Sequence, residues 1–142
     1  MAHQTILHAT CVAFGPRAVL ITGASGTGKS SLGLALLAAG GALISDDRTA
    51  LQRRGESLLA SCPAAAIHGR IEARGMGILM APAQDSAEVA LVVDLNAPAE
   101  TQRLPPPRNT RICDVTLPLF FRPEGAHFAH ALALYLSHGP AT

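Results

Sequence analysis

Eight consecutive residues, 23–30, have the types and spacing of a loop that binds phosphate. Their sequence is Gly-Ala-Ser-Gly-Thr-Gly-Lys-Ser, a full match to the pattern G-x-x-x-x-G-K-[ST]. Glycines let backbone N–H groups approach phosphate oxygens, and the N-terminus of a following helix adds a positive dipole end. The residues expected to bind phosphate are Gly23, Ala24, Ser25, Gly26, Thr27, Gly28, Lys29 and Ser30. The pattern favours a nucleotide polyphosphate as the ligand, and a chance glycine-rich turn is the alternative.

Lys29 is the only lysine of the chain, whose other ten basic residues are all arginines. An ammonium group is a compact charge on a flexible stem, whereas a guanidinium group is a planar fork. We expect Lys29 to bridge the outer phosphates of the nucleotide and the hydroxyl of Ser30 to ligate Mg²⁺.

The segments beside this loop have the patterns of a strand before it and a helix after it. Residues 18–22 are a short apolar run typical of a strand buried on both faces, and residues 5–14 predict an earlier strand. Residues 29–39 predict a helix that ends at two glycines. Strand, loop and helix therefore follow one another in the order that the motif requires.

A phosphate loop normally works with an acidic residue that follows a second apolar strand. Two places qualify: Asp46 and Asp47 after residues 42–45, and Asp94 after residues 91–93. Because adjacent residues of an extended chain point to opposite faces, we expect Asp46 and Asp47 not to form a close carboxylate pair. One would face the phosphates, and the other would cap a turn or pair with Arg48. Asp46 is the preferred functional candidate.

The rest of the chain adds antiparallel strands to a parallel core. The predicted elements are a hairpin over residues 49–59, a loop at 81–88, a strand at 89–95, a stiff proline-rich connector at 98–109, a strand at 112–121 with Pro118 favouring a sheet edge, and a helix at 127–136. Residues 71–78 have the sequence Ile-Glu-Ala-Arg-Gly-Met-Gly-Ile. This pattern is consistent either with a backbone segment that lies close to a ligand or with a tight surface loop. These patterns predict a single α/β domain over residues 1–142.

Composition excludes several kinds of partner. The net charge is +1 and no basic cluster exceeds Arg53-Arg54, so we expect no nucleic acid to bind. No run approaches the roughly 18 apolar residues of a membrane span, and no leader is apparent, which predicts a cytoplasmic protein without a membrane partner. Charged residues make up only 15% of the chain, which favours self-association. The three cysteines form no C-x-x-C pair and are expected to be small buried residues.

Three segments together resemble the catalytic domain of HPr kinase/phosphorylase: residues 23–30, residues 43–48 (Leu-Ile-Ser-Asp-Asp-Arg) and residues 71–78. The last is close to that family's E-[IV]-R-G-[LIVM]-G signature and departs from it only at Ala73. The resemblance runs from about Thr5 to about Phe121. It points to the compact form of some Gram-negative bacteria, notably alphaproteobacteria, in which the family's N-terminal domain has no counterpart and the C-terminal helical part is shortened.

The resemblance implies roles for individual residues. His8 corresponds to an active-site histidine near the phosphates, and Asp46 to the carboxylate that acts as general base in phosphorylation and as general acid in the reverse reaction. Glu72 corresponds to a Mg²⁺ ligand beside Ser30. By a short local match, Arg103 corresponds to an arginine near the transferred phosphate; its alternative is a solvated arginine. Together with the residues of the phosphate loop, the expected catalytic residues are His8, Lys29, Asp46 and Arg103, and the expected metal ligands are Ser30, Glu72 and Asp47.

The resemblance also implies a fold and an activity. The fold is the P-loop type shared by HPr kinase and phosphoenolpyruvate carboxykinase, with a mixed sheet and a C-terminal helix. The activity is ATP- and Mg²⁺-dependent phosphorylation of a serine on the phosphocarrier protein HPr of the phosphotransferase system, by a homo-oligomer that is commonly a hexamer. The family's Pro-x-Lys-x-Gly-Arg loop is altered here, with Phe120 at the lysine position, and the loop between residues 77 and 89 is short. We therefore expect reverse phosphorolysis to be weak or absent.

Two alternatives remain open from the sequence. The first is a catalytically weakened ATP-binding regulator of a sensor kinase or of another phosphotransferase-system protein, which the altered loops favour. The second is a P-loop kinase that acts on a small molecule, for which residues 103–111 would have to supply an arginine-rich lid.

Overall fold

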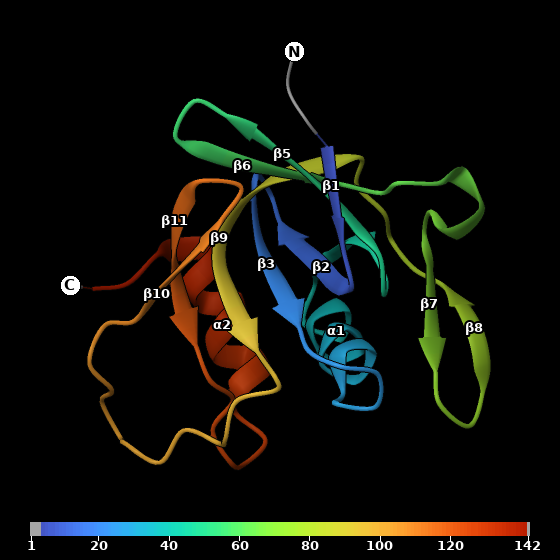
Figure 1. The fold of residues 1–142 in the computed structure, drawn as a ribbon. Coiled ribbons are helices and arrows are strands. Elements are labelled where there is room, and N and C mark those ends of the chain that lie inside the picture. The colour runs from blue at the N-terminus through green and yellow to red at the C-terminus, as the bar shows by residue number, and fades with distance from the viewer. Residues whose placement is uncertain (1–3, 142) are drawn as a thin grey trace.

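A mixed sheet of nine strands forms the centre of the computed structural model, which describes residues 4–141 (Figure 1). The main path of the sheet has the order β1-β5-β6-β9-β3-β2-β4, and β11, flanked by β10, joins at β9. The strands of this sheet are β1 (Gln4–Leu7), β2 (Ala9–Phe14), β3 (Arg17–Thr22), β4 (Ala42–Ser45), β5 (Thr49–Arg54), β6 (Ser57–Ser61), β9 (Ser86–Asp94), β10 (Asn109–Ile112) and β11 (Val115–Phe120). A separate hairpin joins β7 (Arg70–Ala73) to β8 (Gly77–Met80).

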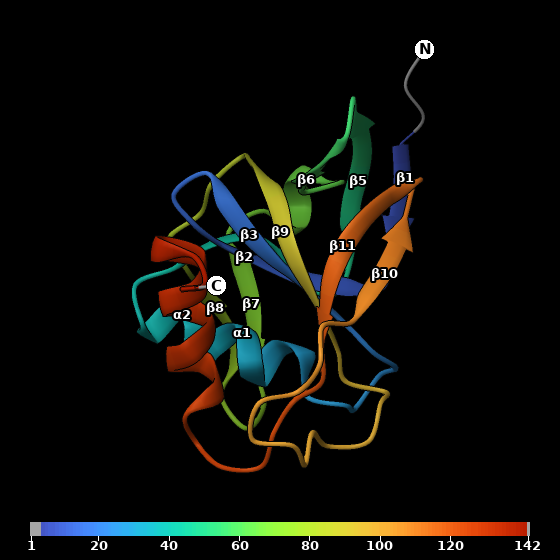
Figure 2. The same cartoon turned by 90° about the vertical axis from the view of Figure 1, so that its left-hand side faces the viewer.

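The two helices, α1 (Lys29–Ala38) and α2 (Phe128–His138), lie together on one face of the sheet (Figure 2). Side chains alternate along β3, so that Val19 and Ile21 pack against the helices while Ala18 and Leu20 pack on the other face. That other face is covered by side chains of β5, β6 and β11 as the sheet curls over itself. Both faces of β3 are therefore buried, which explains its uniformly apolar sequence. Neither helix is long and apolar enough to cross a membrane, as far as the described residues go.

The parallel part of the sheet consists of β3, β9 and β11. Strand β9 runs parallel to β3 along one edge, and its C-terminal end runs parallel to β11 along the other. Antiparallel pairs surround this core: β2 lies between β3 and β4, and β6 pairs with the N-terminal end of β9. The predicted mixed α/β fold is thus confirmed.

Several predicted elements differ in detail from the structure. The single strand expected at residues 5–14 is broken at His8 into β1, which pairs with β5, and β2, which pairs with β3. The strand expected at residues 112–121 is part of a hairpin, because Cys113 and Asp114 turn the chain with φ of 50° and 63°. Strand β11 is therefore not an edge strand; β10 lies outside it. Strand β9 begins at Ser86, inside the segment expected to be a loop.

The connector between β9 and β10 is held against the end of β11. Its Glu100 forms an ion pair with Arg108, and the Arg108 guanidinium stacks over Phe121 at 4.5 Å from the ring centroid. The hydrogen bond from Arg108 holds the pKa of the Glu100 carboxyl below its usual value. The backbone N–H of Glu100 also donates to the carbonyl oxygen of Arg122 at 3.0 Å. These contacts fix the connector where it passes residue 122.

The cysteines are only partly as expected. Cys11 is fully buried in the sheet, and this burial raises the pKa of its thiol. Cys62 and Cys113 are half-buried, so the expectation that all three are buried is wrong for these two.

Helix α2 provides a matched test of the core. Leu132 is 4% exposed and packs against the sheet, whereas Leu134 on the same helix is 64% exposed. We expect Leu132→Ala to lower the free energy of unfolding by about 2–5 kcal/mol, because it leaves a cavity in the core. Leu134→Ala should change it by less than about 0.5 kcal/mol. Urea denaturation of both variants measures the difference, and equal effects would show that α2 does not pack as described.

Candidate active site

The phosphate loop connects β3 to α1 and depends on glycine at three positions. Gly23, Gly26 and Gly28 have φ of 151°, 87° and 101°, a region that residues with a side chain rarely occupy. A Cβ atom at Gly23 would also lie 2.5 Å from the hydroxyl oxygen of Thr27. Gly28 is the N-cap residue of α1, so the free N–H groups of the helix open onto the loop. The loop thus has the geometry of an anion site.

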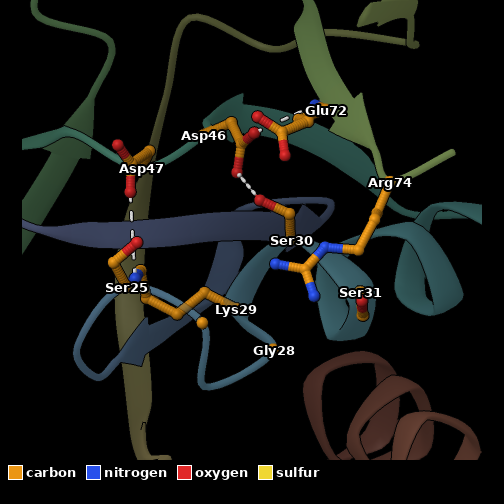
Figure 3. Close-up of a pocket in the computed structure, with 10 residues that line it drawn as sticks. Ser25, Gly28, Lys29, Ser30, Ser31, Asp46, Asp47, Glu72 and Arg74 are labelled. Atoms are coloured by element: carbon orange, nitrogen blue, oxygen red, sulfur yellow. Dashed lines mark hydrogen bonds and ion pairs between the residues drawn. The ribbon is translucent and has the colours of Figure 1, made fainter. Parts of the chain in front are cut away.

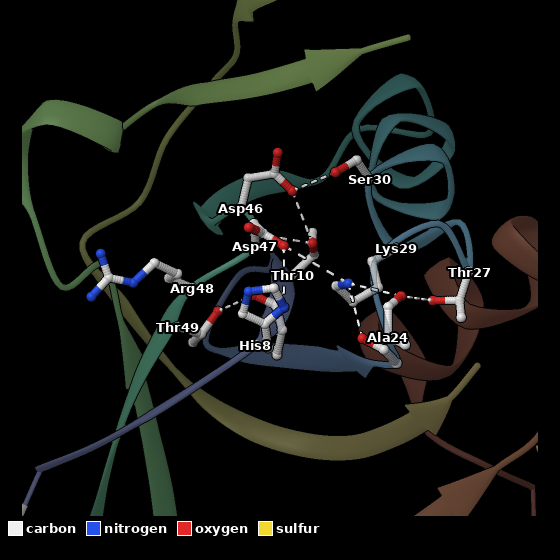
Figure 4. Close-up of polar contacts among 12 residues, drawn as sticks. His8, Thr10, Ala24, Thr27, Lys29, Ser30, Asp46, Asp47, Arg48 and Thr49 are labelled. Carbon is white, nitrogen blue, oxygen red and sulfur yellow. Dashed lines mark hydrogen bonds and ion pairs between the residues drawn. The ribbon is translucent and has the colours of Figure 1, made fainter. Parts of the chain in front are cut away.

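Lys29 folds back over the loop that contains it (Figure 4). Its side chain is only 5% exposed, and its Nζ donates to the carbonyl oxygens of Gly23 at 2.9 Å and Ala24 at 3.3 Å. The same Nζ lies 3.8 Å from Oδ1 of Asp47. A buried ammonium needs such partners because burial of an unpaired charge is costly. The lysine is therefore held with its charge at the loop.

Asp46 joins three separate parts of the fold. Its Oδ1 accepts hydrogen bonds from the hydroxyls of Thr10 and Ser30, each at 2.8 Å (Figure 4). Its Oδ2 accepts one from the backbone N–H of Glu72 at 3.1 Å (Figure 3). Strand β2, the start of α1 and the β7–β8 hairpin thereby meet at one carboxylate. Thr10 is buried and was not apparent as a site residue from the sequence, because nothing but its tertiary position distinguishes it.

Asp47 faces the same pocket as Asp46, although the two residues are adjacent. The expectation that only one of them would do so is wrong, because φ of 63° at Asp47 interrupts the alternation of an extended chain. Asp47 is 55% exposed, and its Oδ1 lies 3.6 Å from Nδ1 of His8 in addition to its contact with Lys29. Asp47 thus lies between His8 and Lys29 and contacts both (Figure 4).

A pocket of about 210 Å³ lies between the phosphate loop and these carboxylates. Arg74, just after β7, extends toward Ser30 and Ser31 and lines this pocket together with Glu72 (Figure 3). Arg74 was not singled out from the sequence, although the E-x-R-G pattern of residues 72–75 was available as a signal. The described pocket therefore combines a phosphate loop, three carboxylates and two cations.

Comparison with known proteins identifies the family of this chain. The sequence model described as HPr Serine kinase C-terminal domain matches residues 1–119. The chain belongs to this HPr kinase family. An HPr kinase/phosphorylase of Lactobacillus delbrueckii subsp. bulgaricus is 35% identical over 123 residues, which cover 79% of this chain and 39% of that protein. One of Lactococcus lactis subsp. cremoris is 34% identical over 102 residues, covering 67% and 33%.

A solved structure supports the same relationship for the HPr kinase-family domain. It is that of the HPr(Ser) kinase/phosphatase from Coxiella burnetii, with a TM-score of 0.74 and 30% identity over 95% of this chain and 93% of that chain. The curated relatives are much longer: this chain spans 26%, 33% and 39% of three of them. The similarity to them therefore concerns only part of those proteins.

The pocket of this HPr kinase-family domain suits a magnesium ion held jointly with phosphate. Hydroxyl and carboxylate oxygens of Ser30, Asp46, Asp47 and Glu72 line it, and Mg²⁺ prefers oxygen ligands. Among residues 4–141, no group of three or more His, Cys, Asp or Glu is placed to hold a metal ion by itself. Mg²⁺ usually takes one or two carboxylates and fills its remaining positions with water and substrate phosphates. The donor set therefore fits the ion when a polyphosphate is also bound.

The arginines of segment 103–111 do not line the phosphate pocket. Arg103 lines a separate cavity of about 670 Å³ between the connector, the end of β11 and α2. Arg108 is paired with Glu100, and Arg111 lies 3.8 Å from Asp114.

A different arginine, Arg122, approaches the phosphate loop from the segment after β11. Its Nη1 lies 3.4 Å from the position that a Cβ atom of Gly28 would occupy. No sequence pattern singles out Arg122, because this residue is far from the loop along the chain.

Proposed function

We propose that this domain is an ATP-dependent protein kinase that phosphorylates a serine of the phosphocarrier protein HPr. The observation that carries the proposal is the position of Asp46, which hydrogen-bonds to Ser30 of the phosphate loop and borders the pocket into which that loop opens. The printed names of the family relatives, HPr kinase/phosphorylase and HPr(Ser) kinase/phosphatase, point to the same reaction.

The proposed mechanism is positioning combined with charge stabilisation. The loop N–H groups and Lys29 hold the phosphates of ATP. Asp46 accepts the proton of the serine hydroxyl while the serine oxygen attacks the γ-phosphorus of ATP. The bond between the γ-phosphorus and the β,γ-bridging oxygen breaks, and ADP leaves with that oxygen. Ser30, with Glu72 or Asp47, would hold Mg²⁺, which would neutralise part of the phosphate charge. His8 would contact the transferred phosphoryl group from beside Asp47.

Two further residues bear on the range of this activity. Arg103 lies in the separate cavity, so a role at the transferred phosphate requires the connector to move. Phe120 packs edge-on against Tyr135, with ring centroids 5.6 Å apart, and lines that same cavity. Because a phenyl ring there supplies no charge to the phosphate, we propose that reverse phosphorolysis is weak or absent.

A phosphotransfer assay tests the proposed function. We expect incubation with ATP, Mg²⁺ and HPr of the same source to add one phosphate to a serine of HPr, detected by mass spectrometry. Subsequent addition of inorganic phosphate should remove little of it. Nucleotide binding without phosphoserine would favour an ATP-binding regulator instead, and transfer to a metabolite but not to HPr would favour a small-molecule kinase.

The assembly and location of the domain are part of the proposal. We propose a homo-oligomer in the cytoplasm, since charged residues are only 15% of the chain and ATP is a cytoplasmic substrate. Sedimentation equilibrium measures the assembly, and a monomer at micromolar concentration would contradict it.

A further inference from the structure

The phosphate pocket is too small for a whole nucleotide. Its volume is about 210 Å³, whereas pockets that enclose small organic ligands have about 300–1,000 Å³. Its lining is charged and polar, which suits phosphate but not an apolar base. The nucleoside must therefore lie elsewhere, at a place that the phosphate chain can reach.

Two other cavities are candidates, and only one of them adjoins the phosphate loop. The larger, of about 670 Å³, has no loop residue in its lining. The smaller has a volume of about 380 Å³. It is lined by Thr27 of the loop, by Leu95, Ala97 and Ala99 after β9, and by residues 122–125 (Arg-Pro-Glu-Gly) after β11. We call this smaller one the β9-side cavity.

The topology places the β9-side cavity opposite the carboxylates. Strand β3, which leads into the loop, has β2 as one neighbour and β9 as the other. Asp46 and Asp47 follow β4, beyond β2, whereas the cavity is formed by residues that follow β9 and β11. A phosphate chain lying along the loop would thus have its reacting end at Asp46 and its other end at this cavity.

The walls of the β9-side cavity are connected to the loop and to each other. Asn96, between the wall residues Leu95 and Ala97, accepts a hydrogen bond at its Oδ1 from the backbone N–H of Ala24 at 2.9 Å. Arg122 is held at its carbonyl oxygen by Glu100 and places its Nη1 next to Gly28. Its guanidinium therefore stands where the loop meets the cavity.

We propose that the β9-side cavity binds the nucleoside of ATP and that Arg122 contacts the phosphates at the junction. This inference rests on the proposed function and adds the place of the nucleoside to it. Leu95, Ala97, Ala99 and Pro123 provide apolar contact for a flat base, while a guanidinium can donate two parallel hydrogen bonds to phosphate oxygens. None of the described lining residues is aromatic, so the base is not stacked and selectivity among purines is modest.

Comparison of ATP with inorganic tripolyphosphate tests this proposal, because the latter has the phosphates without the nucleoside. Affinities of both are measured by calorimetry with Mg²⁺. A variant combining Ala97→Leu and Ala99→Leu fills the cavity with branched groups that cannot stack on a base. It is expected to weaken ATP binding by about 10-fold or more, the equivalent of roughly 1.4 kcal/mol, and to change tripolyphosphate binding by less than about twofold.

Two further variants serve as controls. Ala131→Leu makes the same change in the larger cavity and should leave both affinities unchanged. Arg122→Ala should weaken ATP and tripolyphosphate alike, by about 10-fold, because it removes a charge-assisted contact to phosphate. A change in ATP binding alone in Arg122→Ala would contradict its place at the phosphates.

The outcomes separate this proposal from the function on which it rests. Unchanged ATP binding in the double variant, or an equal loss of both ligands, would overturn the nucleoside site. Weaker ATP binding in Ala131→Leu would indicate that the nucleoside binds in the larger cavity instead. If the unaltered protein binds neither ligand, the proposed function itself fails.

Discussion

Replacing Lys29 with alanine is expected to lower the rate of phosphoryl transfer by about 10²–10³-fold and to weaken ATP binding as well. The side chain is almost fully buried, its Nζ is held by two carbonyl oxygens of the loop, and that charge borders the phosphate pocket. No other lysine exists to replace it. Steady-state kinetics with HPr and calorimetry with ATP measure the two effects.

Charge alone should not restore the activity of the Lys29 variant. We expect Lys29→Arg to remain impaired, because a planar guanidinium does not fit a position enclosed by the carbonyls of Gly23 and Ala24. Arg54→Ala removes one positive charge from an exposed strand end and should leave the rate unchanged. An unaltered rate in Lys29→Ala would remove this residue from the site.

Asp46→Asn is expected to lower turnover by about 10²-fold or more, while ATP affinity stays near that of the unaltered protein. Asparagine preserves the shape of the side chain and can still accept hydrogen bonds from Thr10 and Ser30. It cannot take up a proton from serine, and its amide nitrogen cannot accept from the backbone N–H of Glu72. Unfolding by urea should show a loss of about 1.5–3 kcal/mol in the free energy of unfolding, because that hydrogen bond is accepted by a charged group.

Two other carboxylates provide the controls for Asp46. Asp85→Asn makes the same change at a residue that is 98% exposed and should have no effect on turnover. Asp47→Asn should lower turnover less than Asp46→Asn does. A larger loss of turnover in Asp47→Asn than in Asp46→Asn would indicate that Asp47 is the general base. Normal turnover in Asp46→Asn would refute the role of Asp46 as the base.

The local elements around the phosphate loop could be predicted because their signals lie within short segments. The run of residues 18–22, the glycines of the loop and the start of α1 at Lys29 all agree with the structure. The broken strands could not be predicted in the same way. Residues 113–114 lack the usual glycine of a tight turn, and the break at His8 reflects the choice of different sheet partners by β1 and β2.

The site could be predicted only in part, for a similar reason. Lys29, Ser30 and the acidic pair stand out by type and spacing, and the pocket does contain them. The prediction that Asp46 and Asp47 point to opposite faces was wrong, because it assumed an extended backbone and Asp47 has a left-handed conformation. Arg103 was selected from a short local match, whereas its side chain is carried by a connector that packs against β11 and α2.

A phosphate loop with one ammonium group, and an acidic pair after a second apolar strand, can be inferred from the amino-acid sequence because glycine spacing and side-chain chemistry act over a few adjacent residues. Which distant groups meet at the loop depends instead on the three-dimensional arrangement of the strands. The order β11-β9-β3-β2-β4 carries Arg122 to one side of the loop and Asp46 to the other, and it directs Phe120 into another cavity. Strand order depends on long-range packing of both sheet faces, which no single segment encodes.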